Sequence, residues 1–211
     1  MPVSSLNRFS VPLATNDSSS SQGLLMPKLK YRFRVTLDSF GVPGTPTTEL
    51  TKQVMNVSRP NLQFEEIKLP VYNSTVKLAG KHSWQDTVLT LRDDVTNAVT
   101  TLVGQQLQKQ FDFFEQSSAA SGIDYKFTMR VELLDGGNGA NTPTVLEAFD
   151  FLGCYVKQVE YQGGDYGSAT DIMDIKCTIA YDNALQYGLG GSPTGIGQQI
   201  GRTVRTLALG G

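Results

Sequence analysis

The strongest constraint on the fold is a strict alternation of apolar and polar residues in two widely separated runs. Apolar side chains occupy every odd position from 29 to 37, and the same pattern returns from 125 to 133. Alternation with a period of two puts one set of side chains on each face of an extended strand, so both runs predict half-buried β-strands. Further strands are expected at 53–58, 62–69, 76–80, 84–91, 146–151, 155–161 and 172–181.

One segment has the spacing of a helix instead. Apolar residues between Val95 and Phe114 recur at three- and four-residue steps, and Asp93 and Asp94 are good N-cap residues. We therefore expect an amphipathic helix over 94–116. Because helices do not alternate with the strands, the order excludes a parallel α/β fold and predicts an antiparallel β-sandwich or barrel with one helix. A sheet of this size must close, cover its edges or pair them with neighbouring subunits.

Polar segments flank this β-rich region. Residues 1–27 contain a serine run, three prolines and isolated apolar residues, which indicates an arm that either docks on a neighbour or is disordered. Residues 188–211 contain eight glycines and predict a flexible arm. The expected organisation is an N-terminal arm at 1–27, one β domain at 28–187 and a Gly-rich C-terminal arm at 188–211.

The charge is low and uneven. Charged residues make up 18% of the chain and the net charge is −2, which gives no overall attraction to nucleic acid and suits repeated self-packing. Residues 1–105 carry +3 and residues 106–211 carry −5. In the first predicted strand, alternation puts the aromatic residues opposite the basic ones, so together they form no base-stacking platform. These basic residues are Lys28, Lys30, Arg32 and Arg34.

The sequence shows no catalytic or metal-binding constellation. His82 is the only histidine, and the sequence offers no partner that would orient it as a general base. Cys154 and Cys177 lie far apart in apolar runs, which is typical of buried free thiols rather than of a zinc site. We therefore predict no enzyme activity, no metal and no cofactor. The chain also has no run of 18 apolar residues and no secretory signal pattern, so we expect no membrane insertion.

Two longer segments carry a family resemblance. Residues 69–99 combine a Pro-led loop, a Val-Lys-x-Ala-Gly strand, a Trp-led strand and an Asp pair before the helix. Residues 149–184 combine a strand ending at Gly153, a polar bend through Asp165 and a last strand closing on Tyr181 and Asp182. With these segments in matching order across 28–187, the chain resembles the tail tube proteins of contractile-tailed bacteriophages. The matching residues of the first segment are Pro70, Val76, Lys77, Ala79, Gly80, Trp84, Asp86, Val88, Thr90 and Asp93.

The resemblance implies a structural subunit that forms hexameric rings. Inner sheets of the six subunits would join into a barrel around a lumen, and the stacked rings would form a hollow conduit for genome ejection. Tail sheath, baseplate and tape measure proteins are the implied partners, in a virion tail assembled in the host cytoplasm. DNA would pass without specific binding, because an acidic lumen repels phosphates. The candidate lumen acids are Glu160, Asp165, Asp171 and Asp174.

By the same resemblance, one loop would pack on adjacent subunits or on the next ring. The alternative is an ordinary surface hairpin with Trp84 in the core of the monomer. The candidate inter-subunit residues are Val71, Tyr72, Asn73, Ser74, His82 and Trp84.

Two classes of function stay open. The first is a tail tube subunit, with a baseplate tube-initiator or the inner-tube protein of a secretion system as close alternatives. The second is a β-sandwich ligand-binding module with Gly-rich turns around the ligand, which requires a pocket or an exposed apolar patch.

Overall fold

The computed structural model describes residues 27–42, 47–136, 142–168 and 170–198. The chain divides into two compact units, Met1–Arg32 and Phe33–Gly211. Most of the predicted N-terminal arm, residues 1–26, therefore lies outside the described residues, as do residues 199–211 of the predicted C-terminal arm.

The first unit contributes a turn from Leu29 to Arg32, where the sequence predicted the start of a strand. The Arg32 amide donates to the Leu29 carbonyl at 3.2 Å, and the Arg32 guanidinium lies 5.4 Å from the centre of the Tyr31 ring. The prediction that charges and aromatics here point to opposite faces is therefore wrong for Tyr31 and Arg32. Because a turn replaces the extended backbone, the strand begins only at Phe33.

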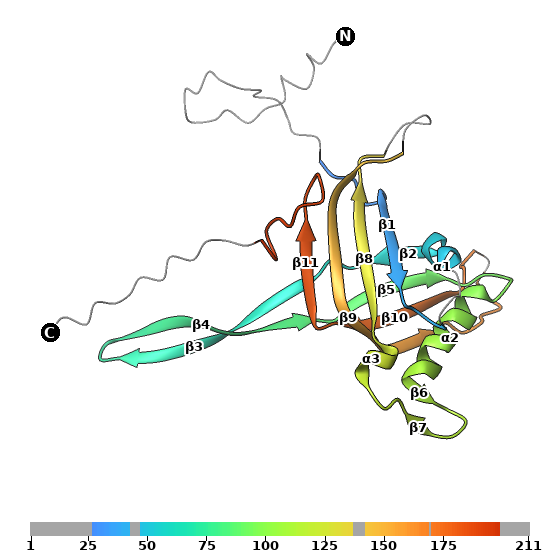
Figure 1. Cartoon of the computed structure of the whole chain (residues 1–211), viewed down its shortest axis with the longest axis horizontal. Helices are drawn as coiled ribbons and strands as arrows, with labels where there is room; N and C mark the ends of the chain where they lie inside the picture. The colour runs from blue at the N-terminus through green and yellow to red at the C-terminus, as the bar shows by residue number, and fades with distance from the viewer. Residues whose placement is uncertain (1–26, 43–46, 137–141, 169, 199–211) are drawn as a thin grey trace, which may run out of the picture. The chain divides into compact units, whose positions relative to one another are not determined.

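The second unit is mainly antiparallel β-structure, as the sequence predicts (Figure 1). Its described helices are α1 (Thr48–Lys52), α2 (Ala98–Gln110) and α3 (Gly122–Tyr125). Its described strands are β1 (Phe33–Asp38), β2 (Val54–Val57), β3 (Asn61–Val71), β4 (Ser74–Gln85), β5 (Thr87–Arg92), β6 (Phe111–Asp112), β7 (Ser117–Ser118), β8 (Phe127–Leu134), β9 (Val145–Tyr161), β10 (Asp174–Ala180) and β11 (Asn183–Tyr187).

Two antiparallel sheets share the long strand β9. Its first half pairs with β8 and β11, and β1 continues this sheet beyond β8. Its second half pairs with β10, which is followed by β5 and β2. Figure 1 shows the two sheets crossing, with β9 running from one into the other. From the sequence, the segment at 155–161 either continues the strand at 146–151 or follows it, and the structure has one continuous strand.

Gly153 is where β9 changes sheets. Its φ is +68°, a left-handed conformation that L side chains rarely adopt, and a Cβ there would lie 2.2 Å from an Asp182 carboxylate oxygen. The left-handed backbone therefore favours glycine at this position, and a larger residue would also have to displace the Asp182 carboxylate.

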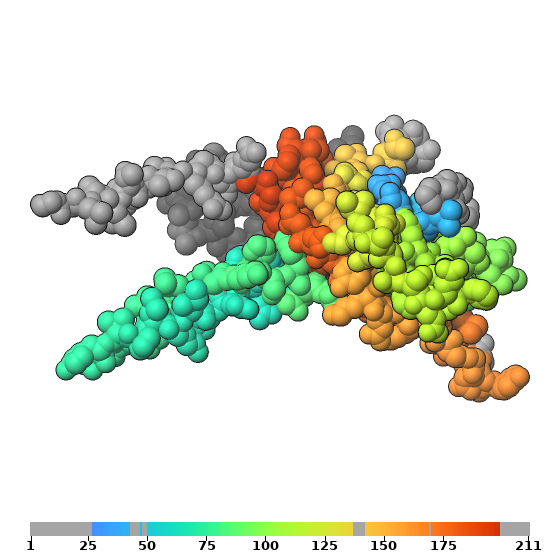
Figure 2. All heavy atoms as spheres, turned by 60° about the horizontal axis from the view of Figure 1, so that its bottom comes forward, coloured from blue at the N-terminus to red at the C-terminus, as the bar shows by residue number. Residues whose placement is uncertain are grey.

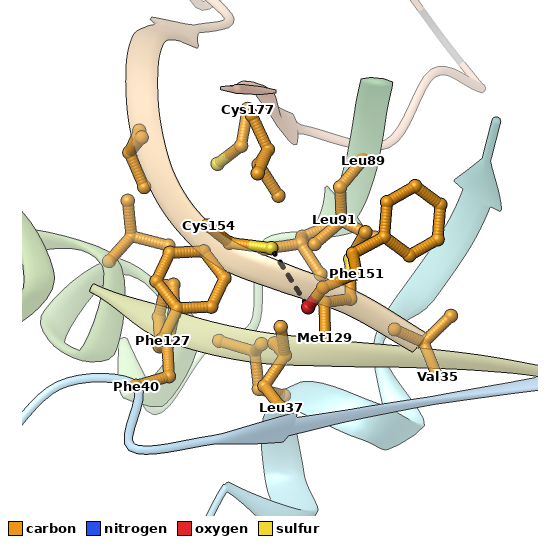
Figure 3. Close-up of a cluster of buried hydrophobic side chains, with 14 of the residues drawn as sticks. Val35, Leu37, Phe40, Leu89, Leu91, Phe127, Met129, Phe151, Cys154 and Cys177 are labelled. Carbon is orange, nitrogen blue, oxygen red and sulfur yellow. Dashed lines mark hydrogen bonds between the residues drawn. The ribbon is translucent and has the colours of Figure 1, made fainter. Parts of the chain in front are cut away.

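The core lies between the two sheets and α2. Buried side chains from β1, β5, β8 and β9 converge in it (Figure 3). Cys154 and Cys177 are both buried and unbonded to each other, which confirms the prediction of free thiols. Burial raises the pKa of each thiol to about 12, so both thiols are protonated and unreactive at neutral pH. The largest fully buried side chains include Phe127, Phe151, Leu37, Leu50, Leu89, Leu91, Met129, Ile175 and Ile179.

Helix α2 is shorter than the predicted 94–116. Asp93 and Asp94 precede it, and their carboxylates accept the Thr100 hydroxyl at 2.8 Å and the Val99 amide at 3.4 Å. The N-cap itself is Asn97, which has a left-handed backbone (φ 56°). Acidic residues thus do stabilise the start of this helix, but from a turn outside it.

At its other end, α2 stops because its last side chain bonds to the sheet. The Gln110 amide group donates to the Val156 carbonyl and accepts the Val156 amide, both at 2.9 Å. This covers an edge position of β9, and the chain becomes extended at Phe111 (φ −150°). Phe111 and Phe114, which were expected in the apolar stripe of the helix, are instead exposed.

Gln106 links α2 to the loop after β1 and to the end of α3 from a completely buried position. Its side chain accepts the Gly41 amide at 2.9 Å and donates to the Tyr125 carbonyl at 2.7 Å. Both backbone groups would lose their partner if an apolar side chain replaced the amide, and an unsatisfied buried group costs about 1–3 kcal/mol.

We expect Gln106→Leu to lower the free energy of unfolding by about 2–4 kcal/mol, because it leaves two backbone groups unpaired. Chemical denaturation followed by circular dichroism measures this change. The control is Gln108→Leu in the same helix, where the side chain is exposed and its hydrogen bonds, to the Asp112 carboxylate at 2.8 Å and from the Phe113 amide at 3.4 Å, are open to solvent. It should change stability by less than about 0.5 kcal/mol; equal losses in the two variants would contradict the role given to Gln106.

Candidate assembly surfaces

The β3–β4 hairpin is one continuous two-stranded ribbon. The sequence predicted a loop after Leu69 and a strand end at Gly80, but pairing continues through both positions to the Val71–Ser74 pair. Gly80 lies at an irregularity in the register, where a Cβ would come within 2.9 Å of the Glu65 carbonyl oxygen. Glycine therefore lets the strands approach at a bulge instead of ending the strand. Figure 2 shows the hairpin standing clear of the other described strands of its unit.

The outer part of this hairpin has one apolar and one polar face. Directly opposed residues lie on the same face of an antiparallel pair. The apolar face consists of the pairs Ile67–Leu78 and Leu69–Val76, with Val71 beyond them. The polar face consists of Glu66–Ala79, Lys68–Lys77 and Pro70–Thr75.

The described residues leave this apolar face uncovered. Its five large side chains are 45–51% exposed, whereas one-sided apolar strands normally bury that face. Contiguous exposed apolar surface of this kind marks an interaction site. On the opposite face, Lys68 and Lys77 face each other and Lys77 also pairs with Glu66 at 2.9 Å.

Aromatic rings connect the hairpin to the core. Successive ring centres lie 4.8–6.3 Å apart, within the range of favourable aromatic packing. The half-buried Trp84 packs on Tyr181, which in turn packs edge-on against Phe151. From the core outward, the series is Phe151, Tyr181, Trp84, His82 and Phe64.

The structure divides the six predicted inter-subunit residues into two groups. Val71 and Ser74 form the last pair of the hairpin, and Tyr72 and Asn73 make its two-residue turn, with Tyr72 fully exposed. His82 and Trp84 lie on β4 near the root. The sequence did not identify the apolar face between these groups as a site, although the alternation of residues 67, 69 and 71 indicates it.

A second exposed apolar group follows α2. Phe113 and Phe114 are 59% and 95% exposed, and Ile123 beyond β7 is 87% exposed. The Phe111 and Phe113 rings pack edge-on at 5.3 Å. The described residues therefore expose a second apolar surface besides the hairpin face.

A chain of ion pairs crosses the face of β1, β8 and β9 that points away from the core. Glu132, only 7% exposed, accepts from Arg34 at 2.7 Å and from Arg130 at 2.9 Å. Arg130 also donates to both oxygens of Asp150 at 3.1 and 3.2 Å, and its guanidinium lies 5.7 Å from the centre of the Tyr187 ring. We call these four charged residues the ion-pair ladder.

Burial and pairing with arginine have opposite effects on the pKa values of the two carboxylates of the ladder. Burial would raise the pKa of Glu132, but the hydrogen bonds from Arg130 and Arg34 outweigh it and hold the pKa below its usual value. At Asp150 burial is the stronger effect and raises the pKa despite the charge of Arg130. Glu132 is therefore the carboxylate whose ionisation stabilises the fold.

The four predicted lumen acids lie around the connection from β9 to β10. Glu160 pairs with Lys176 at 3.2 Å, and Asp165 accepts the Gly167 amide at 2.8 Å. Asp171 lies in the connection and Asp174 begins β10. The sequence did not single out the four ladder residues, because there their charges look like an ordinary solvated strand face.

Other kinds of site are weakly represented in the part of the chain that the structure describes. One small pocket there has a volume of about 230 Å³ and is lined by Val42, Gln105, Gln108 and Lys109, below the range of about 300–1,000 Å³ usual for ligand sites. No three His, Cys, Asp or Glu side chains among the described residues are grouped to hold a metal ion. None of the described helices is both long and apolar enough to span a bilayer.

Solved structures of contractile injection systems contain chains of similar fold. A chain of the anti-feeding prophage tube-terminating cap matches with a TM-score of 0.58 at 16% identity, over 82% of this chain and 99% of that one. A chain of the six-fold symmetrised baseplate of that prophage gives 0.53 at 13%, over 79% and 99%. A chain of the PVC sheath–tube complex gives 0.52 at 20%, over 77% and 93%. No family model matches the sequence, and no curated protein matches it either.

The chain therefore has a fold that occurs in the tube, cap and baseplate assemblies of contractile injection systems. This likeness agrees with the predicted fold class, which is mainly antiparallel β-structure.

We expect Glu132→Gln to lower stability at pH 7 by about 1–3 kcal/mol, because it weakens two hydrogen bonds between charged groups, one of them from a half-exposed arginine. Since the folded-state pKa of Glu132 is lowered from 4.5, its contribution is complete above that pH and disappears as the pH falls through the lower folded value. Denaturation of both proteins from pH 7 to pH 3 should show the difference shrinking below about pH 4.5.

The matched control is Glu160→Gln. Glu160 forms an exposed pair with Lys176, and such pairs contribute about 0–1 kcal/mol. A stability difference between wild type and Glu132→Gln that persists unchanged at pH 3 would contradict the role of the ionised carboxylate.

Proposed function

We propose that this chain is the structural subunit of a contractile phage tail tube. It would form hexameric rings that stack into the hollow conduit for genome ejection. The observation that carries the proposal is the apolar face of the β3–β4 hairpin, which the described residues leave uncovered on a fold that recurs in tube and cap assemblies. Its occupant is a second copy of the chain, and the exposed group around Phe113 and Phe114 is a further apolar surface for such contacts.

Strand directions support closure into a ring. Each neighbouring pair in the sheet β1–β8–β9–β11 is antiparallel, so β11 runs opposite to β1. Rotation about an axis along the strands preserves their direction, and β1 of one copy placed beside β11 of the next continues the antiparallel order. Six copies are supported by the six-fold symmetrised baseplate that contains a chain of similar fold.

This arrangement would turn the ion-pair ladder toward the axis. The core and the second sheet lie on the other side of β1–β8–β9–β11. Because the cores and second sheets of six copies cannot fit inside the barrel, they would lie outside it. A wall whose arginines are already bonded to carboxylates offers few free cations to DNA phosphates. The genome and the tape measure protein would then pass without specific binding. A lumen role also stays a prediction for Glu160, Asp165, Asp171 and Asp174, in addition to the role proposed for the ion-pair ladder.

The remaining partners follow from the same proposal. The outer surface of the tube would contact the tail sheath and its end the baseplate, in a virion tail assembled in the host cytoplasm. The role is structural, with no catalytic step and no membrane insertion.

A tube-end protein is the second candidate. It is favoured by the likeness to a chain of the tube-terminating cap, which is covered over 99% of its length. A baseplate initiator or the inner-tube protein of a secretion system stays an alternative, and either would also need surfaces for self-assembly. Copy number per purified particle, measured by quantitative mass spectrometry, separates a tube subunit from an end protein: many rings indicate the tube, and one or two indicate an initiator or terminator.

We expect Val76→Lys to prevent tube formation, because it puts a charge on the apolar face that a neighbour would bury. The critical concentration for assembly should rise at least about tenfold, equivalent to about 1.4 kcal/mol per contact. Negative-stain microscopy and sedimentation of the purified full-length protein measure this change.

Thr75→Lys is the control, because Thr75 is adjacent but belongs to the polar face. It should assemble as the wild type does, with both variants equally stable. Wild-type protein that stays monomeric at high concentration and gains stability from a small-molecule ligand would favour the ligand-binding module instead.

A further inference from the structure

The outer edge of β11 is already occupied within a single chain. Gln186 donates its amide to the Ile196 carbonyl at 2.8 Å and accepts the Thr194 amide at 2.9 Å. Gly188 donates to the Ser192 carbonyl at 3.1 Å. These groups point away from β9, so the turn at residues 188–198 covers the edge at which β11 could pair with another strand. We call residues 188–198 the edge cap.

Glycines allow the edge cap to pack this closely. Gly195 and Gly197 have φ values of +67° and +98°, and a Cβ on Gly195 would lie 2.5 Å from the Gln186 side-chain oxygen. A Cβ on Gly197 would lie 2.7 Å from a Leu185 methyl group. Where the sequence predicted a flexible arm, residues 188–198 thus form a turn in which these glycines take left-handed conformations.

The edge cap is a poor strand for continuing the sheet. Pro193, which bridges to Tyr187, has no amide to donate, and the left-handed glycines interrupt the extended backbone. β11 beneath it is regular and forms an uninterrupted register with β9 over Asn183–Tyr187. The edge cap therefore protects β11 without replacing it as a pairing edge.

The opposite edge of the same sheet has a regular strand. Among the described residues β1 has a single strand neighbour, β8. Near the end of β1, the Thr47 hydroxyl donates to the Leu37 carbonyl. β1 has six residues and β11 has five, and they run in opposite directions. β1 of a second copy is therefore long enough to pair with β11, and it has the direction that antiparallel pairing needs.

We infer that the edge cap is displaced during assembly and that β1 of a neighbouring copy takes its place on β11. This inference rests on the proposed function, since it identifies the seam through which rings would close. In this exchange β11 loses its few backbone hydrogen bonds to the edge cap and gains those to β1 of the neighbour, which is a longer regular strand. Until then the cap shields the free subunit from uncontrolled edge-to-edge pairing.

A reversible lock tests the displacement. A Cβ built on Gly188 lies 3.5 Å from the Thr194 Cβ, at the short end of the disulfide range of about 3.5–4.5 Å. The double variant Gly188→Cys/Thr194→Cys should therefore fix the cap on β11 when oxidised. Native Cys154 and Cys177 are buried and can stay in place, because the pKa of each is raised to about 12. The single variants serve as controls.

We expect the oxidised double variant to remain unassembled and the same sample to form rings or tubes after reduction, by sedimentation and negative-stain microscopy. Equal assembly of the oxidised and reduced protein would overturn the displacement while leaving the proposed function intact.

A weakened cap provides the second test. Thr194→Pro removes the amide that bonds to Gln186, whereas Thr194→Ala keeps it, so the pair isolates one backbone bond. Thr194→Pro should lower the critical concentration for assembly severalfold relative to Thr194→Ala. An unchanged or higher value would contradict the inference. If the wild type, the reduced double variant and Thr194→Pro all stay monomeric, the proposed function fails, and the inference with it.

Discussion

The whole domain depends on one strand that belongs to both sheets. β9 pairs with β8 and β11 along its first half and with β10 along its second, and the change occurs at Gly153, where the backbone is left-handed and Asp182 leaves no room for a Cβ. Because the strand is continuous, the two sheets cross at a fixed place and enclose one core. The root of the hairpin is attached to that core through Trp84 and Tyr181, so the position of the hairpin also follows from the bend in β9.

Local pattern was sufficient to predict much of this fold. Alternation identified β8 and most of β1, since one face of each strand packs in the core and the other carries the ion-pair ladder. The sequence pattern failed to predict where strands and helices end when contacts between distant residues determine the backbone conformation. Gly80 and Gly153 looked like strand ends, yet each lets a strand continue past a close contact. The helix prediction ran too far because Gln110 bonds to Val156, which lies 46 positions away in the sequence.

The candidate site was predictable only in part for the same reason. The turn from Val71 to Ser74 is visible in the sequence, but an uncovered apolar face can be recognised only once the register with β4 is known. The ion-pair ladder likewise joins charges from three strands. The edge cap depends on bonds between Gln186 and residues that composition alone assigns to a flexible tail.

Trp84 is the only tryptophan in the chain, and it lies between His82 and Tyr181 at the point where the hairpin leaves the core. Its indole N–H is buried and has no hydrogen-bond partner among the described residues. When the protein is excited at wavelengths that tryptophan absorbs and its eight tyrosines do not, its fluorescence therefore comes from one indole, at the point where the hairpin leaves the core. Any bending of the hairpin relative to the sheets changes the surroundings of that indole, so the unlabelled protein carries its own optical probe of hairpin movement.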